Sequence, residues 1–191
     1  MTCSIDYDVL IVGGGPAGIS TALFLVSAAP HLRERVAVIE RSHYPREKIC
    51  AGAIGGRADR ALASIGVRVD VPSALVRGLS VVTPAGRLVS RRAEPIGRVV
   101  RRREFDAALA EIAKKRGIRV LEGHRVTRME RSEDGVTVFV EGQGALRAHV
   151  VVGADGVGSV VRRQLGLGHG TLVAQAVEVD TLPSSMDPEE D

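Results

Sequence analysis

The fold is decided by residues 8–18, which read Asp8-Val9-Leu10-Ile11-Val12-Gly13-Gly14-Gly15-Pro16-Ala17-Gly18. The apolar run before the glycines predicts a short strand buried on both faces, and apolar side chains at helical spacing follow as far as Ala28. A second apolar run, Val36–Ile39, completes a predicted strand–helix–strand unit. Between strand and helix the glycines match G-x-G-x-x-G, the pattern that binds the pyrophosphate of a dinucleotide.

Each glycine of this pattern has a physical task. Gly13 permits a tight turn, Gly15 lets a pyrophosphate approach the backbone, and Gly18 lets the helix pack closely on the strand. The helix starting at Pro16 offers unpaired N–H groups and the positive end of its dipole to the phosphates. Glu40, 22 residues beyond Gly18, ends the second strand, where a carboxylate can accept hydrogen bonds from ribose hydroxyls. Its charge would repel the 2′-phosphate of NADP, so this motif allows FAD and NAD equally.

Composition restricts the other functions open to the chain. The net charge is +3 and 23 of the 26 basic residues are Arg, but they are scattered and only five aromatic residues accompany them. This pattern argues against a nucleic-acid interface. Cys3 and Cys50 lie far apart with no His at ligand spacing, which argues against a disulfide framework or a metal site. No apolar run approaches the roughly 20 residues of a membrane span and no signal-peptide pattern opens the chain, so we expect a cytoplasmic protein.

The rest of the chain predicts further helices and two groups of strands. Two helices are expected, the first after a charged, Gly-rich loop: Ala58–Ile65 and Glu104–Arg116. Strand-like pairs lie between Gly78 and Val100 and are broken by the turn Thr83–Gly86. Four later strands are predicted, the last two forming a hairpin: Ile118–Leu121, Arg125–Met129, Val136–Val140 and Leu146–Gly153.

The end of the last predicted strand reads G-A-D-G-x-x-S-x-V-R from Gly153 to Arg162. This segment, with Asp155 and Gly156 at its centre, resembles the second flavin-contacting motif of the p-hydroxybenzoate hydroxylase-like FAD-dependent oxidoreductases. The resemblance implies an α/β fold, a Rossmann-like FAD-binding domain of the glutathione-reductase-like, p-hydroxybenzoate hydroxylase type, with inserted β-strands. It favours FAD over NAD, because nicotinamide dehydrogenases do not pair the Gly-rich motif with such a segment. The sequence also lacks the catalytic His or Tyr-Lys constellation that an NAD-dependent dehydrogenase would need.

Further segments carry the same resemblance. Arg102, three residues before the pair Phe105-Asp106, matches the family pattern at a helix start and would contact the flavin side of the cofactor. Val126 would meet the adenine through its backbone. Residues 46–52 (Arg-Glu-Lys-Ile-Cys-Ala-Gly) resemble the loop of geranylgeranyl-reductase-like members that carries Lys, Cys and small residues toward the isoalloxazine ring. Many of those members have Pro at position 49 and Gly at position 51, where this chain has Ile and Ala.

The resemblance therefore implies two sets of site residues. Lys48 and Cys50 hold the catalytic positions beside the flavin ring. The implied cofactor contacts are Gly13, Gly15, Pro16, Ala17, Gly18, Glu40, Arg41, Ala51, Gly52, Arg102, Val126, Asp155 and Gly156.

The resemblance runs from about Tyr7 to about Val179 and then breaks. The third motif of the family, a Gly-Asp pair that closes over the pyrophosphate and ribityl chain, does not occur in this sequence. We expect an FAD-binding domain over 1–168, with inserted substrate-side strands at 70–99, and the start of an incomplete substrate domain with an acidic tail over 169–191. Residues 171–179 predict the strand at which that domain resumes. The chain is then either a fragment of an enzyme or a natural split subunit completed by a second polypeptide.

The resemblance implies an oxidoreductase in which FAD takes a hydride from NADPH or NADH and passes reducing equivalents on. The loop at 48–52 favours a prenyl-chain reductase, which sends a hydride and a proton to an isolated alkene. The alternative is an aromatic hydroxylase, in which reduced FAD captures oxygen. The expected substrate is accordingly a small molecule, isoprenoid or aromatic. A non-catalytic FAD-binding fragment that needs a second half is the alternative of another class.

Overall fold

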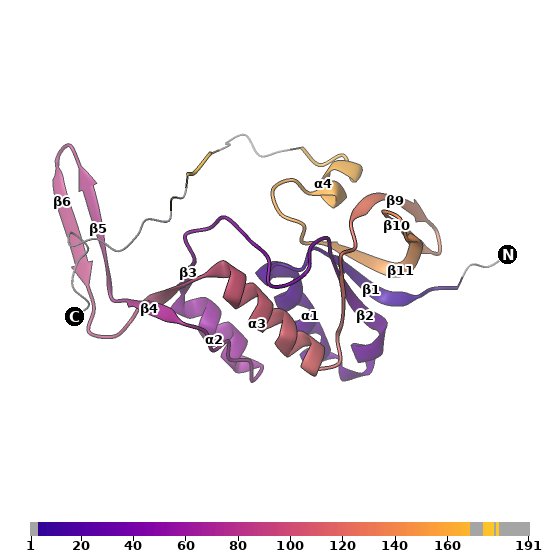
Figure 1. Cartoon of the computed structure of the whole chain (residues 1–191), viewed down its shortest axis with the longest axis horizontal. Coiled ribbons are helices and arrows are strands. Elements are labelled where there is room, and N and C mark those ends of the chain that lie inside the picture. Colours follow the sequence, from indigo (N-terminus) through magenta and orange to yellow (C-terminus); the bar gives the residue numbers. More distant parts are fainter. Residues whose placement is uncertain (1–3, 169–173, 178, 180–191) are drawn as a thin grey trace.

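The computed structural model describes residues 4–168, 174–177 and 179, and its centre is a six-stranded sheet in the order β8-β2-β1-β11-β10-β9 (Figure 1). Strands β8, β2, β1 and β11 are parallel, whereas β11, β10 and β9 form an antiparallel meander. The strands of this sheet are β1 (Tyr7–Val12), β2 (Val36–Glu40), β8 (Arg119–Glu122), β9 (Val126–Ser132), β10 (Gly135–Val140) and β11 (Gly144–Gly153).

Helices cover one face of the parallel strands. Ile19 and Leu23 of one helix and Phe105 and Leu109 of another pack into a single buried cluster with Ile11 of β1. Because Leu109 is only 1% exposed, its truncation to Ala would cost about 2–5 kcal/mol. Figure 1 shows α1, α2 and α3 on the same side of the sheet. The helices are α1 (Pro16–Ala28), η1 (Pro30–Arg35, a 3₁₀ helix), α2 (Gly56–Ser64), α3 (Arg102–Lys115) and α4 (Val160–Gln164).

Strands β1 and β2 are buried on both faces, as their unbroken apolar runs predict. Successive side chains of a strand point to opposite faces. Accordingly Ile11 and Val38 belong to the helix-side cluster, whereas their neighbours Leu10 and Ile39 pack with Val138 and other residues of the meander. The carboxyl ends of β1 and β2 are thereby fixed side by side, and the Gly-rich turn and Glu40 follow directly.

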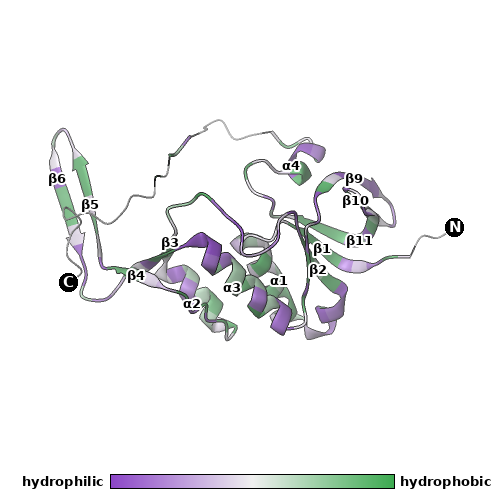
Figure 2. Cartoon of the chain, viewed as in Figure 1, coloured by the Kyte–Doolittle hydropathy of each residue, from purple (hydrophilic) through white to green (hydrophobic). Residues whose placement is uncertain are grey.

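A second group of strands is inserted between β2 and α3, with β3 before α2 and the other four after it. Three of them form a small sheet in the order β3-β7-β4, and the other two form a hairpin that projects from one end of the molecule in Figure 1. Leu79, Val81, Val82, Leu88 and Val89 of this hairpin are all more than half exposed, and Figure 2 shows the apolar character of β5. The inserted strands are β3 (Ala53–Gly55), β4 (Ser73–Val76), β5 (Gly78–Thr83), β6 (Gly86–Arg91) and β7 (Gly97–Val100).

Most of the predicted elements are confirmed, including α1 with both its ends and the turn at Thr83–Gly86, but four details differ. Helix α3 begins at Arg102 rather than Glu104, β3 shortens the predicted loop over 41–57, and β4 precedes the first predicted inserted strand. The predicted strand at 171–179 is wrong for residues 174–177 and 179, which form no strand, and its other residues lie outside the described part. The predicted acidic tail, 180–191, and Cys3 also lie outside it. The domain boundaries and the substrate-side role of 70–99 stay predictions.

Candidate cofactor-binding site

The Gly-rich turn between β1 and α1 leaves Gly15 open, whereas Gly13, Gly14 and Gly18 are enclosed. Gly13 has a φ of 108°, and a Cβ there would lie 2.3 Å from the carbonyl oxygen of Ala154. A Cβ on Gly18 would lie 1.9 Å from the carbonyl oxygen of Gly13. A Cβ on Gly15 would meet only Arg46 Nη2, at 3.7 Å. The backbone at Gly15 is therefore the part of the turn that a phosphate can approach.

Glu40 holds the turn from the end of β2. Its Oε2 accepts a hydrogen bond from the Gly14 N–H at 2.9 Å, and its Oε1 accepts one from the Ser42 N–H at 3.0 Å. The side chain is buried beside the turn. An ionised carboxylate has about four lone-pair sites, so acceptor capacity remains for ribose hydroxyls.

A second turn, at the end of β11, lies against the first. The Ala154 N–H donates to the Val12 carbonyl at 2.7 Å, which ties the two turns together. Asp155 Oδ2 accepts the N–H of Val160, the first residue of α4, at 2.6 Å, while its Oδ1 is buried and has no hydrogen-bond partner among the described residues. Gly156 has a φ of 78°, which allows the sharp reversal. The unpaired Oδ1 is an acceptor available to a hydroxyl-bearing ligand.

Both turns line one pocket of about 560 Å³. Most site residues predicted from the sequence lie on its wall, from five separate segments of the chain. They are Gly13, Gly15, Pro16, Ala17, Glu40, Arg41, Lys48, Arg102, Val126, Asp155 and Gly156. The chain thus assembles an open glycine, an acidic residue after β2 and an unpaired buried carboxylate oxygen in one place, and these features fit a dinucleotide.

Four of the named residues do not line the pocket. Gly18 lies behind the turn, and Gly52 packs against β7, where it accepts the Val100 N–H at 3.0 Å. Cys50 and Ala51 are exposed. Cys50 nevertheless interacts with Arg102. The pKa of that guanidinium is raised, chiefly by its hydrogen bond to Asp106 and further by Cys50.

Arg46, Tyr44 and Asp106 form a buried polar cluster that the sequence reasoning did not assign. Tyr44 donates its hydroxyl to the Gly14 carbonyl, and burial together with the charge of Glu40 raises the pKa of that hydroxyl. The Arg46 guanidinium lies 5.6 Å from the Tyr44 ring centroid and 3.2 Å from Asp106 Oδ2. The spacing of Asp106 four residues after Arg102 on α3 was a usable signal, but nothing in the sequence placed Arg46 beneath Gly15.

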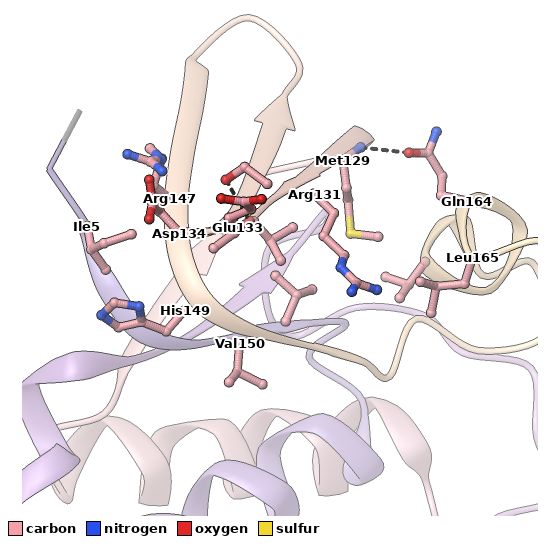
Figure 3. A pocket seen from close by; sticks show the side chains of 15 residues that line it. Ile5, Met129, Arg131, Glu133, Asp134, Arg147, His149, Val150, Gln164 and Leu165 are labelled. Carbon is pink, nitrogen blue, oxygen red and sulfur yellow. Dashed lines mark hydrogen bonds between the residues drawn. The ribbon is translucent and has the colours of Figure 1, made fainter. Parts of the chain in front are cut away.

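A larger pocket, of about 920 Å³, lies between the meander and α4 (Figure 3). Met129 of β9 donates its backbone N–H to Gln164 Oε1 at 2.8 Å across it, and His149 and Arg147 of β11 lie on its rim. None of the site residues predicted from the sequence lines this larger pocket. The smaller pocket is the better candidate, because both glycine-containing turns converge there and the open backbone at Gly15 lines it.

The described residues contain no cluster of His, Cys, Asp or Glu able to hold a metal ion. Within the same part of the chain, every helix is too short or too polar to cross a bilayer. Neither observation adds a second kind of site to the pocket just described.

Parallel strands flanked by helices, with the Gly-rich turn at their carboxyl ends, make this a Rossmann-type dinucleotide-binding domain. Comparison with known proteins then gives the family. Residues 6–190 match the family model described as FAD binding domain. The chain belongs to this family, whose cofactor is FAD, and the sequence-based prediction of the fold and of FAD is confirmed.

Curated relatives and solved structures agree with this assignment. The chain is 29% identical to a digeranylgeranylglycerophospholipid reductase of Methanococcus vannielii over 85% of this chain and 41% of that protein. It is 33% identical to aklavinone 12-hydroxylase RdmE of Streptomyces purpurascens over 87% of this chain and 36% of that protein. The crystal structure of AlpK superposes with a TM-score of 0.71 and 25% identity, covering 86% of this chain and 34% of that one. The chain thus spans less than half the length of these relatives.

Proposed function

We propose that this chain is the FAD-binding portion of a flavin-dependent oxidoreductase. The observation that carries the proposal is the convergence of the Gly13–Gly18 turn and the Asp155-Gly156 turn on one pocket, with Lys48 on its wall. FAD, when bound, supplies the hydride and electron transfer that protein side chains cannot perform. The chain's own residues bind it, orient it and keep water from it.

Each part of the pocket suits a part of the cofactor. The open backbone at Gly15 and the amino end of α1 suit the pyrophosphate, because unpaired N–H groups and the helix dipole favour negative charge there. Glu40 suits the adenosine ribose, and the backbone of Val126 suits the adenine. Arg102 and the Asp155-Gly156 turn suit the flavin side. Arg41, Pro16 and Ala17 also lie on the wall, and we place the exposed residues Cys50 and Ala51, with the adjacent buried Gly52, near the flavin ring outside the pocket.

We favour a reductase that draws on NADPH or NADH and acts on an isoprenoid chain. Two observations support it: the Lys48–Gly52 loop, and the similarity to a protein named digeranylgeranylglycerophospholipid reductase. In this assignment Lys48 is the cation nearest the reacting end and Cys50 lies beside the ring. Both roles depend on a completed enzyme with a covered flavin.

Aromatic hydroxylation is a second candidate. It is favoured by the similarity to aklavinone 12-hydroxylase RdmE. That relative is 33% identical to this chain, compared with 29% for the reductase described above. The FAD site would be the same in both cases, and the difference would lie in residues that cover the flavin and bind the substrate.

The proposal is tested by purifying the chain, releasing its ligand by heat and separating it by chromatography. We expect FAD; recovery of NAD without flavin would contradict the proposal. The chain alone should hold FAD weakly, because no Gly-Asp segment closes over the pyrophosphate and ribityl chain; at roughly 1 kcal/mol per lost hydrogen bond, this weakens affinity a hundredfold or more.

Catalysis is tested separately, after co-expression with a polypeptide that carries a Gly-Asp motif. An enzyme half should then bleach its flavin absorbance near 450 nm when NADPH or NADH is added without oxygen. Alkene reduction and oxygen-dependent hydroxylation are told apart by the product. Flavin that binds but stays oxidised with either donor would favour the non-catalytic fragment.

A further inference from the structure

The proposed FAD site needs a cation beside Gly15 that its own helix does not provide. A pyrophosphate brings negative charge, and the amino end of a helix offers only about half a positive charge. Helix α1, Pro16–Ala28, contains no Lys or Arg. Its N-cap residue is Gly15, so no side chain caps the first N–H groups. A compensating charge must therefore come from another segment of the chain.

Arg46 is the basic residue best placed to supply that charge. Six basic side chains line the pocket: Arg41, Arg46, Lys48, Arg102, Arg125 and Arg163. Four are exposed, and only Arg46 and Arg102 are partly buried. Of the described atoms, only Arg46 Nη2 comes within 4 Å of a Cβ built on Gly15.

The Arg46 guanidinium is held in place rather than mobile. Its Nη2 lies 3.2 Å from Asp106 Oδ2, its Nε lies 3.6 Å from Glu40 Oε2, and the side chain is only 12% exposed. The Nε is buried and has no hydrogen-bond partner among the described residues, because Glu40 Oε2, its ion-pair partner, lies beyond hydrogen-bond distance. A buried N–H donor without a hydrogen bond is costly, and a ligand oxygen at the turn could satisfy it.

Asp106 fixes this geometry from behind. Its side chain is fully buried on α3, does not line the pocket, and receives both Arg102 Nε at 2.7 Å and Arg102 Nη2 at 3.0 Å as well as Arg46. One carboxylate thus sets the separation of two guanidinium groups that would otherwise repel each other. Bidentate pairing of this kind adds geometric precision as well as energy.

We propose that Arg46 is a pyrophosphate-binding residue of this site and that Asp106 is the positioning residue that presents it. The inference rests on the proposed function, because it assumes a dinucleotide at the Gly-rich turn. It adds a direct phosphate contact from the 41–52 loop and a purpose for the buried charge of Asp106. The adenosine half of the ligand does not depend on either residue.

The test compares ADP, which carries the pyrophosphate, with adenosine, which does not, by titration calorimetry on the 191-residue chain. Arg46→Met should weaken ADP binding about tenfold or more and change adenosine binding less than about twofold. Arg46→Lys should recover part of the lost ADP affinity, because the ammonium restores the charge but not the bidentate geometry of the guanidinium. Asp106→Asn should weaken ADP selectively, and the double variant should be no worse than Arg46→Met, because Asp106 acts through Arg46.

Asp59→Asn is the matched control, because Asp59 forms another bidentate pair with Arg98, at 2.9 and 3.0 Å, away from the pocket. It should leave the ratio of ADP to adenosine affinity unchanged. Should Asp106→Asn fail to fold, the salt dependence of ADP binding serves instead. The affinity for ADP should fall steeply with salt for the natural chain. It should fall only slightly for Arg46→Met, because the variant lacks the charge that attracts the phosphates.

The outcomes separate this inference from the proposed function. FAD binding with an ADP-to-adenosine ratio indifferent to Arg46→Met would overturn the inference and leave the function intact. Equal weakening of ADP and adenosine by Asp106→Asn would make Asp106 merely structural. Arg46-dependent binding of ADP by a chain that takes up NAD and no flavin would overturn the function and keep the inference. A chain that binds neither FAD nor ADP would overturn both.

Discussion

Gly15 and Gly18 show that two glycines of one motif are needed for different reasons. A side chain on Gly15 would enter the pocket, where the end of Arg46 is the one neighbour within 4 Å among the described residues. A Cβ on Gly18 would instead collide with the backbone of Gly13. The first is a requirement of the ligand and the second a requirement of the fold. The motif predicts these two different tasks from the sequence, and the contacts of a Cβ at each position agree with them.

Two substitutions separate these requirements. Gly15→Val should leave the melting temperature close to that of the natural chain and abolish FAD uptake, because the β-branched side chain occupies the phosphate position. Gly18→Ala should lower the free energy of unfolding by about 1–3 kcal/mol through overpacking. Circular dichroism melts and flavin content after reconstitution measure both. A Gly15→Val chain that still takes up FAD, or a Gly18→Ala chain as stable as the natural one, would refute the distinction.

Cys50 gives a second prediction at this scale. It is exposed, does not line the pocket and lies near Arg102, so its removal takes nothing from the core. In an enzyme completed by its missing part, Cys50→Ala should keep full FAD content and alter turnover or product. Flavin absorbance and product analysis are the measurements. Loss of folding with normal activity in the surviving molecules would instead make Cys50 structural.

At the scale of elements, Glu122 of β8 fastens the loop that carries Arg46. Its Oε2 accepts the Tyr44 N–H at 2.7 Å, and its Oε1 accepts Lys114 Nζ of α3 at 2.6 Å. Partial burial raises the pKa of Glu122, but these hydrogen bonds outweigh it and hold the pKa below its ordinary value. One carboxylate therefore joins a strand, a helix and the cofactor loop.

The direction of that shift predicts how stability depends on pH. A lowered pKa means that the folded state favours the ionised carboxylate, so its contribution is complete above the ordinary value near 4.5 and is lost as pH falls through the lowered value. Glu122→Gln should therefore cost about 1–2 kcal/mol at pH 7 and much less at pH 3. Urea unfolding at the two pH values measures this. An equal cost at both would show that the charge of Glu122 does not contribute.

The elements that the sequence predicted well are those whose own residues determine them. The runs in β1 and β2 are apolar on both faces, and α1 begins at Pro16 after the glycines. Each element can therefore be predicted from its own residues. Strand β3 is different, because its three residues are largely exposed and are ordered only by pairing with β7. Arg46 was missed for the same reason, since its role depends on loop, helix and strand meeting in space.

At the scale of the whole molecule, the hairpin β5–β6 stands apart from the FAD pocket. None of its residues lines the pocket, yet it carries several of the most exposed apolar side chains described. A two-stranded hairpin is marginal by itself in water. Its exposed surface and unpaired strand edges are a liability for solubility in the isolated chain.

Removing the hairpin should therefore improve the chain without harming the site. Replacing residues 78–95 with Asn-Gly should raise solubility and leave ADP affinity within about twofold, because β4 and β7 remain paired and a two-residue turn of this type closes such a connection. Static light scattering and calorimetry measure the two effects, with Ser90→Thr at an exposed position of the intact hairpin as a control that keeps its apolar surface. Loss of ADP binding after the excision would show that the hairpin supports the site.

The pairing that makes this excision possible also bears on how the domain can diversify. The chain leaves the Rossmann core along β4 and returns along β7, and Val76 and Gly97 face each other as partners at the exit. Whatever lies between them is attached at a single pair of neighbouring backbone positions. The inserted segment can therefore vary in length while β4 and β7 stay paired, and α3, which carries Arg102 and Asp106, follows β7 at the same place.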